Sequence, residues 1–294
     1  MMQRRAISSM GFRLVATYVA YRGMTAVIGR YIHPVLQHTW IGESQLYTRL
    51  AGIVLYILLN AILVMLLRKR ESKSPKMCRY TVKELVKTFA ITYFACGVAD
   101  ILSGTLVKGV SGIMGQASLL SVFPVQTTDM GMLLYTVFLT PVMEELVFRK
   151  TLCDGLLPYG KLPAAVISGI SFGLFHENLE QSAYASAAGI IFALVYLKTG
   201  KARYAILLHM MINGFGTIET LLLAAGTANL ALVLSIALKV CGLVLVLIRI
   251  KKKGSHLLSG MIWGLKETRI IFTPGILAFL AVTFAGMFLP DINL

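Results

Sequence analysis

The chain has 294 residues, of which 57% are apolar and only 14% charged, with a mean hydropathy of +0.76 and a net charge of +15. A soluble domain of this length needs roughly 25% charged residues to cover its surface, so a wholly soluble protein is excluded and lipid must be the solvent for much of the chain. Its four cysteines, Cys78, Cys96, Cys153 and Cys241, are far apart in no metal-ligand spacing, which argues against a disulfide framework.

Apolar segments that could cross a bilayer as helices, which takes roughly 17–25 residues each, recur along the chain. They are predicted near 8–30, 50–67, 88–107, 131–157, 162–178, 183–197, 204–224, 229–248 and 270–289. The polar stretch before the first one does not resemble a cleavable signal peptide. That first segment carries Arg13 and Arg22 and could instead lie in the membrane interface. Because only helices or closed barrels satisfy the backbone in lipid, we predict an all-α, polytopic bundle of about eight or nine transmembrane helices.

Basic residues are concentrated in one set of the connections between these segments. With the N-terminus inside, 22 of the 28 lysines and arginines lie at positions 4–5, 68–87, 149–161, 198–203 and 249–269. The opposite connections hold only Arg49 and Lys108. Since lysine and arginine favour the cytoplasmic side, the charge indicates membrane topology. It does not indicate a nucleic-acid partner.

Inserting an ionisable side chain into a membrane segment costs roughly 2.5–3.5 kcal/mol, so each such residue is expected to have a structural or functional role. The residues concerned are Asp100, Glu144, Glu145, His176, His209, Glu219 and Lys239. Glu219 and Lys239 lie on consecutive helices and are expected to be structural, either as a pair or with Lys239 bent toward an interface. Asp100 alone indicates little.

The run PVMEELVFRK places two adjacent glutamates before an arginine. Glu145 and Arg149 are four residues apart on one helix face, which predicts an ion pair. Glu144 points about 100° away and can therefore take a different role. Two adjacent carboxylates in a low dielectric are not both cheaply ionised, and Arg149 helps to decide which one is. A plainer interpretation is that the pair only fixes the helix end.

Two further runs bring histidines into the same part of the membrane. His176 ends SFGLFH, one turn after Phe172, while His209 and Asn213 in HMMIN share one helix face. A lone intramembrane histidine is more often a packing residue. Two histidines together with Glu144 and an asparagine, on three helices, favour a functional site.

The depth of these residues supports that interpretation. Glu144 and His176 both lie roughly 20 Å from the turn at 158–161, at 1.5 Å per residue, so a helical hairpin brings them level. His209 and Asn213 start from the same side of the membrane. We therefore expect all four side chains to meet in a cavity that opens to the cytoplasm.

Three spaced motifs on separate helices resemble those of the CPBP family, which comprises type II CAAX prenyl endopeptidases and bacteriocin-processing or self-immunity membrane proteins. They are Glu144-Glu145-x-x-x-Arg149, Phe172-x-x-x-His176 and His209-x-x-x-Asn213. The resemblance covers about 131–216, and Pro141 and Phe148 extend it. The chain departs from the family at Lys150, usually a small residue, and at Ala193, commonly a helix-packing glycine.

The resemblance implies one integral membrane domain with a catalytic core. The N-terminal segments and a basic loop occupy 1–130, the core 131–216, and the C-terminal segments 217–294. It also implies an endopeptidase that acts on a membrane-associated protein or peptide precursor. The compact loops are more typical of a multi-pass protein of a bacterial cell membrane.

Two versions of the chemistry remain open. In the first, Glu144 assisted by His176 activates water, and His209 and Asn213 donate to the oxyanion; Glu145, Arg149 and Phe172 support them. In the second, Glu144, His176 and His209 hold a divalent metal such as zinc. We prefer the first, because Asn213 has a better role there.

Other hypotheses for the function also remain open. A non-catalytic bacteriocin self-immunity or scaffold protein could keep the motifs for packing, and a transporter could use Glu144 and His176 as a proton relay. The run 109–112 matches the GxSG of rhomboid proteases, and 169–173 matches a nucleophile elbow without its strand–turn–helix context. The run 176–180 lacks the second histidine of a zinc-protease motif.

Overall fold

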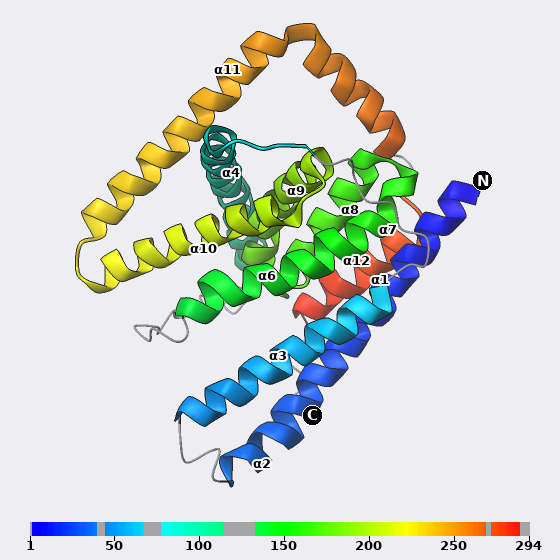
Figure 1. The fold of residues 1–294 in the computed structure, drawn as a ribbon, viewed down its shortest axis with the longest axis vertical. Helices are drawn as coiled ribbons and strands as arrows, with labels where there is room; N and C mark the ends of the chain where they lie inside the picture. Colours follow the sequence, from blue (N-terminus) through cyan, green and yellow to red (C-terminus); the bar gives the residue numbers. More distant parts are fainter. Residues whose placement is uncertain (1, 40–44, 68–77, 115–132, 269–271, 289–294) are drawn as a thin grey trace. The chain divides into compact units, whose positions relative to one another are not determined.

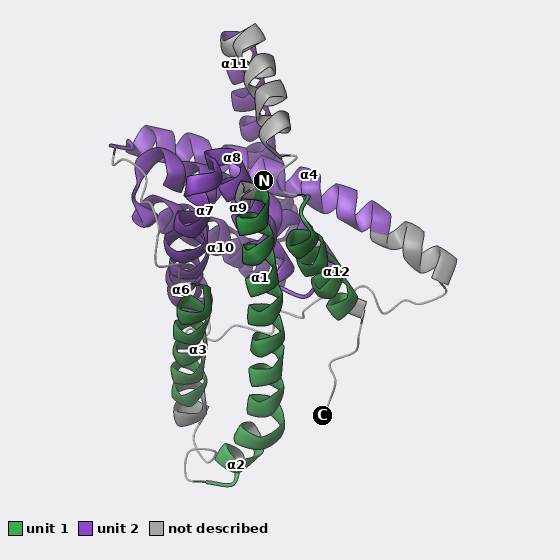
Figure 2. Cartoon of the chain, turned by 90° about the vertical axis from the view of Figure 1, so that its right-hand side faces the viewer, with its two compact units in different colours: residues 1–70, 272–294 green, residues 71–271 purple. Residues whose placement is uncertain are grey.

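The computed structural model describes residues 2–39, 45–67, 78–114, 133–268 and 272–288 (Figure 1). Throughout these ranges the regular structure is helical, with no strand. The chain forms two compact units, residues 1–70 with 272–294 and residues 71–271 (Figure 2). The predicted core of 131–216 falls wholly within the second unit.

The first unit pairs helices from the two ends of the chain. It comprises α1 (Met2–Val27), η1 (Ile28–Ile32), α2 (His33–Gln37), α3 (Gln45–Leu67) and α12 (Pro274–Phe288). Gly11 and Gly275 let α1 and α12 touch, since a side chain on either glycine would collide with the backbone of the other helix. Arg22 donates to the Gly286 carbonyl at 2.8 Å. One of the two arginines that weakened the first predicted segment therefore has a partner in the other helix.

The second unit holds the remaining helices. They are α4 (Val82–Met114), η3 (Tyr135–Leu139), α6 (Thr140–Glu145), η4 (Leu146–Cys153), α7 (Asp154–Leu156), η5 (Leu157–Tyr159), α8 (Lys161–Leu174), α9 (Leu179–Thr199), α10 (Ala202–Ala224) and α11 (Ala228–Thr268). The pieces from η3 to η5 follow one another without a gap. The described part of the predicted segment 131–157 is therefore one helical run in which the hydrogen-bond register changes.

Five helices are long and apolar enough to cross a membrane in the described part of the chain. Their spans are Leu50–Leu67, Val82–Leu106, Gln181–Thr199, Ala202–Ala224 and Ala228–Lys252. Two shorter apolar helices cover Lys161–Leu174 and Pro274–Met287. The chain is therefore a polytopic α-helical membrane protein, and the crossing of the other predicted segments stays a prediction.

One predicted connection is wrong. The basic stretch 249–269 was expected to be a loop, yet α11 continues through it to Thr268. The stretch contains no proline, and its lysine, leucine and methionine residues are good helix formers, so the helix can continue through its three glycines. Hydropathy reports where a helix leaves the apolar layer, and the helix itself extends further. The sixth segment, expected to be short, is the 21-residue helix α9.

Helices α8 and α9 approach closely through small residues. An added Cβ at Gly169 would meet the Ile190 backbone, and one at Gly173 would meet the Ser182 carbonyl. The turn between the helices contains Glu177 in the left-handed region, at φ 56°, and Asn178 accepts the Gln181 N–H at 3.0 Å to cap α9. This corner carries the residue just before Glu177, His176, which thus follows α8 and is not inside it.

Three of the predicted cytoplasmic connections lie at one end of the second unit. The N–H of Cys78 donates to the Thr199 carbonyl at 2.9 Å, which joins the start of α4 to the end of α9. Near the same end of α9, the Tyr196 hydroxyl donates to Asp154 at 2.6 Å. Residues 78–87, 149–161 and 198–203 therefore lie at the same end of the second unit, as the charge pattern predicted for them. Which side of the membrane this is stays a prediction.

Candidate active site

The helix that carries the two glutamates changes its hydrogen-bond register on both sides of them. Residues 135–139 and 146–153 are π-helical, and α6 between them begins with Pro141 in its first turn. Proline has no N–H to donate. In a π segment each backbone hydrogen bond spans one residue more than in an α-helix, and such segments are common at functional sites. The register change sets the directions in which Glu144 and Glu145 leave the helix.

Glu145 and Arg149 form the predicted ion pair. Arg149 Nε lies 2.7 Å from Glu145 Oε2, a second nitrogen lies 3.3 Å from Oε1, and both side chains are fully buried. Arg149 also donates to Ser168 at 2.8 Å, and Ser168 donates to the Phe148 carbonyl at 2.7 Å. The pair therefore ties this helix to α8 inside the protein. The alternative interpretation, in which the pair only fixes a helix end, does not fit two fully buried side chains.

His209 lies between the two glutamates. Its Nδ1 is 3.2 Å from Glu145 Oε1, and its Nε2 is 3.7 Å from Glu144 Oε2. Phe192 stacks on the imidazole at 5.3 Å between ring centroids, and the residue is 5% exposed. Because an ionised carboxylate only accepts, Nδ1 carries a proton and Nε2 is the nitrogen presented to Glu144. The contact between Glu145 and His209 was not predicted from the sequence.

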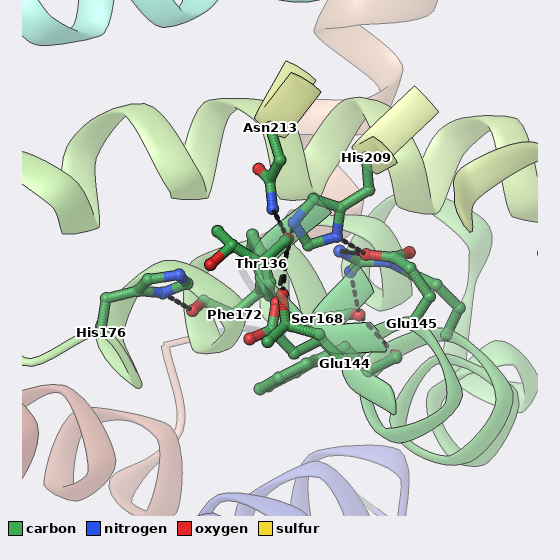
Figure 3. Close-up of polar contacts among 11 residues, drawn as sticks. Thr136, Glu144, Glu145, Ser168, Phe172, His176, His209 and Asn213 are labelled. Atoms are coloured by element: carbon green, nitrogen blue, oxygen red, sulfur yellow. Dashed lines mark hydrogen bonds and ion pairs between the residues drawn. The ribbon is translucent and has the colours of Figure 1, made fainter. Parts of the chain in front are cut away.

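His176 and Asn213 are each held by a backbone carbonyl. His176 Nδ1 lies 2.9 Å from the Phe172 carbonyl, which leaves Nε2 as the acceptor nitrogen of a neutral ring. Asn213 Nδ2 donates to the Thr136 carbonyl at 3.0 Å. Figure 3 shows His209 and Asn213 projecting from the same helix, with His176 set apart at the end of α8.

The ring of Phe172 joins the histidines into one cluster. It meets His176 edge-on at 5.0 Å and His209 edge-on at 5.3 Å between ring centroids. The Arg149 guanidinium lies 5.3 Å from the centre of the same ring. The three motifs thus converge around one buried aromatic ring. The order of the three motifs along the chain did not predict that Phe172 contacts both histidines and Arg149.

A second group of polar side chains lies outside this cluster. Tyr93 donates to Glu219 at 2.6 Å and contacts the Ser235 hydroxyl at 2.9 Å. Lys239 Nζ lies 5.5 Å from the centre of the Tyr93 ring. Glu219 and Lys239 were expected to be structural, either as a pair or with Lys239 bent toward an interface; the contacts found for them in the described residues instead join each side chain to Tyr93 on α4.

The three-ligand metal set does not fit this geometry. Over the described residues, no three histidine, cysteine, aspartate or glutamate side chains are placed to hold one ion. Glu144 and His209 are neighbours, but His176 is fixed by Phe172 at the end of α8. We therefore derive no step through a metal. Ser171 of the elbow-like run lies in the middle of helix α8, which is not the strand–turn–helix that such a nucleophile needs.

Comparisons with known proteins find similarity over the stretch of chain that carries the three motifs. Residues 126–215 match the family model described as type II CAAX prenyl endopeptidase Rce1-like. Over 93 residues the chain is 32% identical to the putative membrane peptidase YdiL of Bacillus subtilis (strain 168), covering 31% of this chain and 37% of that protein. Over 89 residues it is 33% identical to the membrane-embedded CAAX protease MroQ of Staphylococcus aureus (strain USA300), covering 28% and 36%. No solved structure matches.

The fold and the site define a helical membrane protein with a buried glutamate–histidine centre. Within that class, residues 126–215 are similar to the Rce1-like CAAX prenyl endopeptidase model and to two curated membrane peptidases, which supports the resemblance predicted for this stretch. The chain spans little more than a third of the length of the curated relatives that it matches.

Proposed function

We propose that this protein is a membrane-embedded endopeptidase that hydrolyses a peptide bond in a membrane-associated protein or peptide precursor. The observation that carries the proposal is one imidazole held between two carboxylates of different character. Glu145 is fully buried and paired with Arg149, whereas the Glu144 side chain is 23% exposed. Two adjacent carboxyl groups in different environments can take different roles in acid–base chemistry.

Glu144 is the general base of the proposed reaction. It is the carboxylate that water can reach, while the charge of Glu145 is already compensated by Arg149. Glu144 accepts a proton as the water oxygen bonds to the peptide carbonyl carbon, and the carbonyl electrons move to its oxygen. When the carbon–nitrogen bond breaks, Glu144 returns the proton to the leaving amine. His176 assists with the acceptor nitrogen that its bond to Phe172 leaves available.

His209 and Asn213 stabilise the oxyanion in this mechanism. Donation from Nε2 requires a proton on both nitrogens of His209, and a carboxylate oxygen lies beside each nitrogen, Glu145 Oε1 at 3.2 Å from Nδ1 and Glu144 Oε2 at 3.7 Å from Nε2. Once Glu144 has taken up the water proton, it is neutral, and the Nε2–H becomes available to the new negative charge. Glu145 keeps the ring oriented throughout. This geometry favours the metal-free version of the reaction that the sequence left open.

The orientation and location of the protein are part of the proposal. The shared end of α4, α9 and the η4–η5 stretch carries the basic connections, so we place it in the cytoplasm of a bacterial cell. The site would then receive substrate from that side. A peptide segment close to the membrane surface is the substrate class that such a site could reach.

The test compares proteolysis by Glu144→Gln and Glu219→Gln with that by the native chain. Both variants neutralise a glutamate in a membrane helix, but only Glu144 touches the site. We expect Glu144→Gln to reduce peptide release in membrane profiles of expressing cells by about 10²–10⁴-fold, at normal abundance, and Glu219→Gln to retain release. Activity of the purified native chain should survive exhaustive chelation.

Two outcomes would contradict the proposal. Normal peptide release by Glu144→Gln would leave the motifs a packing role, as in a self-immunity or scaffold protein. Loss of activity on chelation, with recovery on adding zinc, would replace the metal-free mechanism.

A further inference from the structure

The carbonyl of Thr136 has lost its usual backbone donors. In an α-helix it would accept from the N–H of Thr140, but that N–H donates to the Tyr135 carbonyl instead. In π-helical register it would accept from residue 141, which is proline and has no N–H. An unsatisfied carbonyl inside a membrane protein is costly, so another donor is needed.

Two side chains supply that donor. The Thr140 hydroxyl lies 2.9 Å from the Thr136 carbonyl, and Asn213 Nδ2 lies 3.0 Å from it. The second contact crosses 77 residues of sequence and joins α10 to the helix of the glutamates. An asparagine amide is planar and has two N–H groups. Fixing one N–H on Thr136 therefore fixes the direction of the other.

We propose that Pro141 is a positioning residue for the oxyanion site and acts through the Thr136 carbonyl on Asn213. The missing N–H of Pro141 leaves the carbonyl free to bind Asn213, and the bond holds the amide one helical turn from His209. The second N–H of Asn213 is then pre-oriented for the reacting oxygen. This inference rests on the proposed function, because it assigns Asn213 to the oxyanion.

Pre-orientation of this donor matters because fixed dipoles need no reorganisation during the reaction. Without the Thr136 bond, the Asn213 amide could turn about two side-chain torsions. A loose donor still binds the oxyanion, but it loses part of its effect on turnover. The loss appears in kcat and not in KM, since the ground-state substrate does not yet carry the charge.

The experiment is a double-mutant cycle of Pro141→Ala and Asn213→Ala. Alanine at 141 restores an N–H that competes for the Thr136 carbonyl and releases Asn213. We expect Pro141→Ala to lower kcat by about 10-fold with KM unchanged, and Asn213→Ala to lower it by about 10²–10³-fold. The double variant should be as active as Asn213→Ala alone, because Pro141 acts only through the amide.

Pro163→Ala is the matched control. Pro163 is also buried in a helix, but it lies in the first turn of α8, where an N–H has no intrahelical acceptor. This variant should keep native kcat. A purely structural role of Pro141 would instead lower the amount of active protein and would add to the effect of Asn213→Ala.

The outcomes separate the inference from the proposed function. Additive losses in the cycle, or full activity of Pro141→Ala beside an impaired Asn213→Ala, would overturn the positioning role alone. Full activity of Asn213→Ala would remove the oxyanion assignment and the inference with it, while leaving Glu144 to be judged by its own variant.

A second measurement works on the native chain if Pro141→Ala does not fold. In protein labelled with ¹⁵N-asparagine, the Asn213 side chain should show one amide proton protected from solvent exchange and one that exchanges faster. Assignment rests on the loss of this pair of signals in Asn213→Asp. Two equally unprotected protons would overturn the proposal.

Discussion

Glu145 is the residue on which most contacts of the site depend. One of its oxygens faces Arg149 Nε and the other faces His209 Nδ1. Breaking a buried ion pair by removing one partner is strongly destabilising, about 3–5 kcal/mol, whereas replacing both partners by apolar groups is often tolerated. Glu145 therefore has two separable functions: its ion pair with Arg149 stabilises the fold, and its contact with His209 orients the imidazole.

This separation gives a prediction. Glu145→Leu alone should lower membrane abundance and thermal stability, because Arg149 is left buried without its anion. Combining Glu145→Leu with Arg149→Met should restore abundance and thermal stability but not proteolysis, because His209 still lacks the carboxylate that holds its tautomer. Thermal unfolding in detergent and peptide release are the two measurements. Recovery of activity in the double variant would show that Glu145 serves only the ion pair.

The sequence predicted the contacts within helices better than those between them. Glu145 and Arg149 are four residues apart, so helix geometry alone brought them together. Glu145 and His209 are 64 residues apart, and only the packing of α10 against η4 and α6 makes them neighbours. Lys150, a departure from the family pattern, binds Asp154 at 3.3 Å with its side chain 45% exposed. The side chain at this departure is therefore accommodated by a partly exposed ion pair.

At the level of elements, the corner between α8 and α9 positions His176. Hydropathy predicted both helices, but it placed His176 inside a span and did not predict the turn that follows Leu174. The close approach needs Gly173, since an added Cβ there would meet the Ser182 carbonyl and the Ser186 side chain. The π-helical segments around α6 were also not predicted, because a change of hydrogen-bond register leaves no hydrophobic pattern in the sequence.

Gly173→Ala should therefore separate α8 from α9. We expect a destabilisation of about 1–3 kcal/mol, as for other overpacked interiors, and a loss of proteolysis as His176 moves. Gly216→Ala on α10 is the control, because nothing lies within 4 Å of an added Cβ there. It should unfold at the native temperature or above, since alanine favours a helix more than glycine does. Equal unfolding temperatures for Gly173→Ala and the native chain would contradict the tight corner.

For the whole molecule, composition was enough to predict the class, because a chain with 14% charged residues has too little polar surface for water. The distribution of basic residues also predicted that 78–87, 149–161 and 198–203 lie at one end of the second unit. It could not predict the helical continuation of α11 to Thr268, since charged residues leave the apolar layer without ending a helix. The two compact units were not predicted either, because the pairing of α1 with α12 joins opposite ends of the sequence.

The last prediction concerns membrane topology, and the native residue Cys78 can serve as its probe. Cys78 is exposed and lies at the end of the second unit where the basic connections meet. Thr227, between α10 and α11, is exposed at the other end of α10. In intact cells, a chain that keeps only Cys78 should resist an impermeant thiol reagent and react after the membrane is opened. A chain whose sole cysteine comes from Thr227→Cys should react at once. The reverse pattern would place the basic end outside, against the cost of moving its lysines and arginines across the membrane, and would turn the proposed active site away from the cytoplasm.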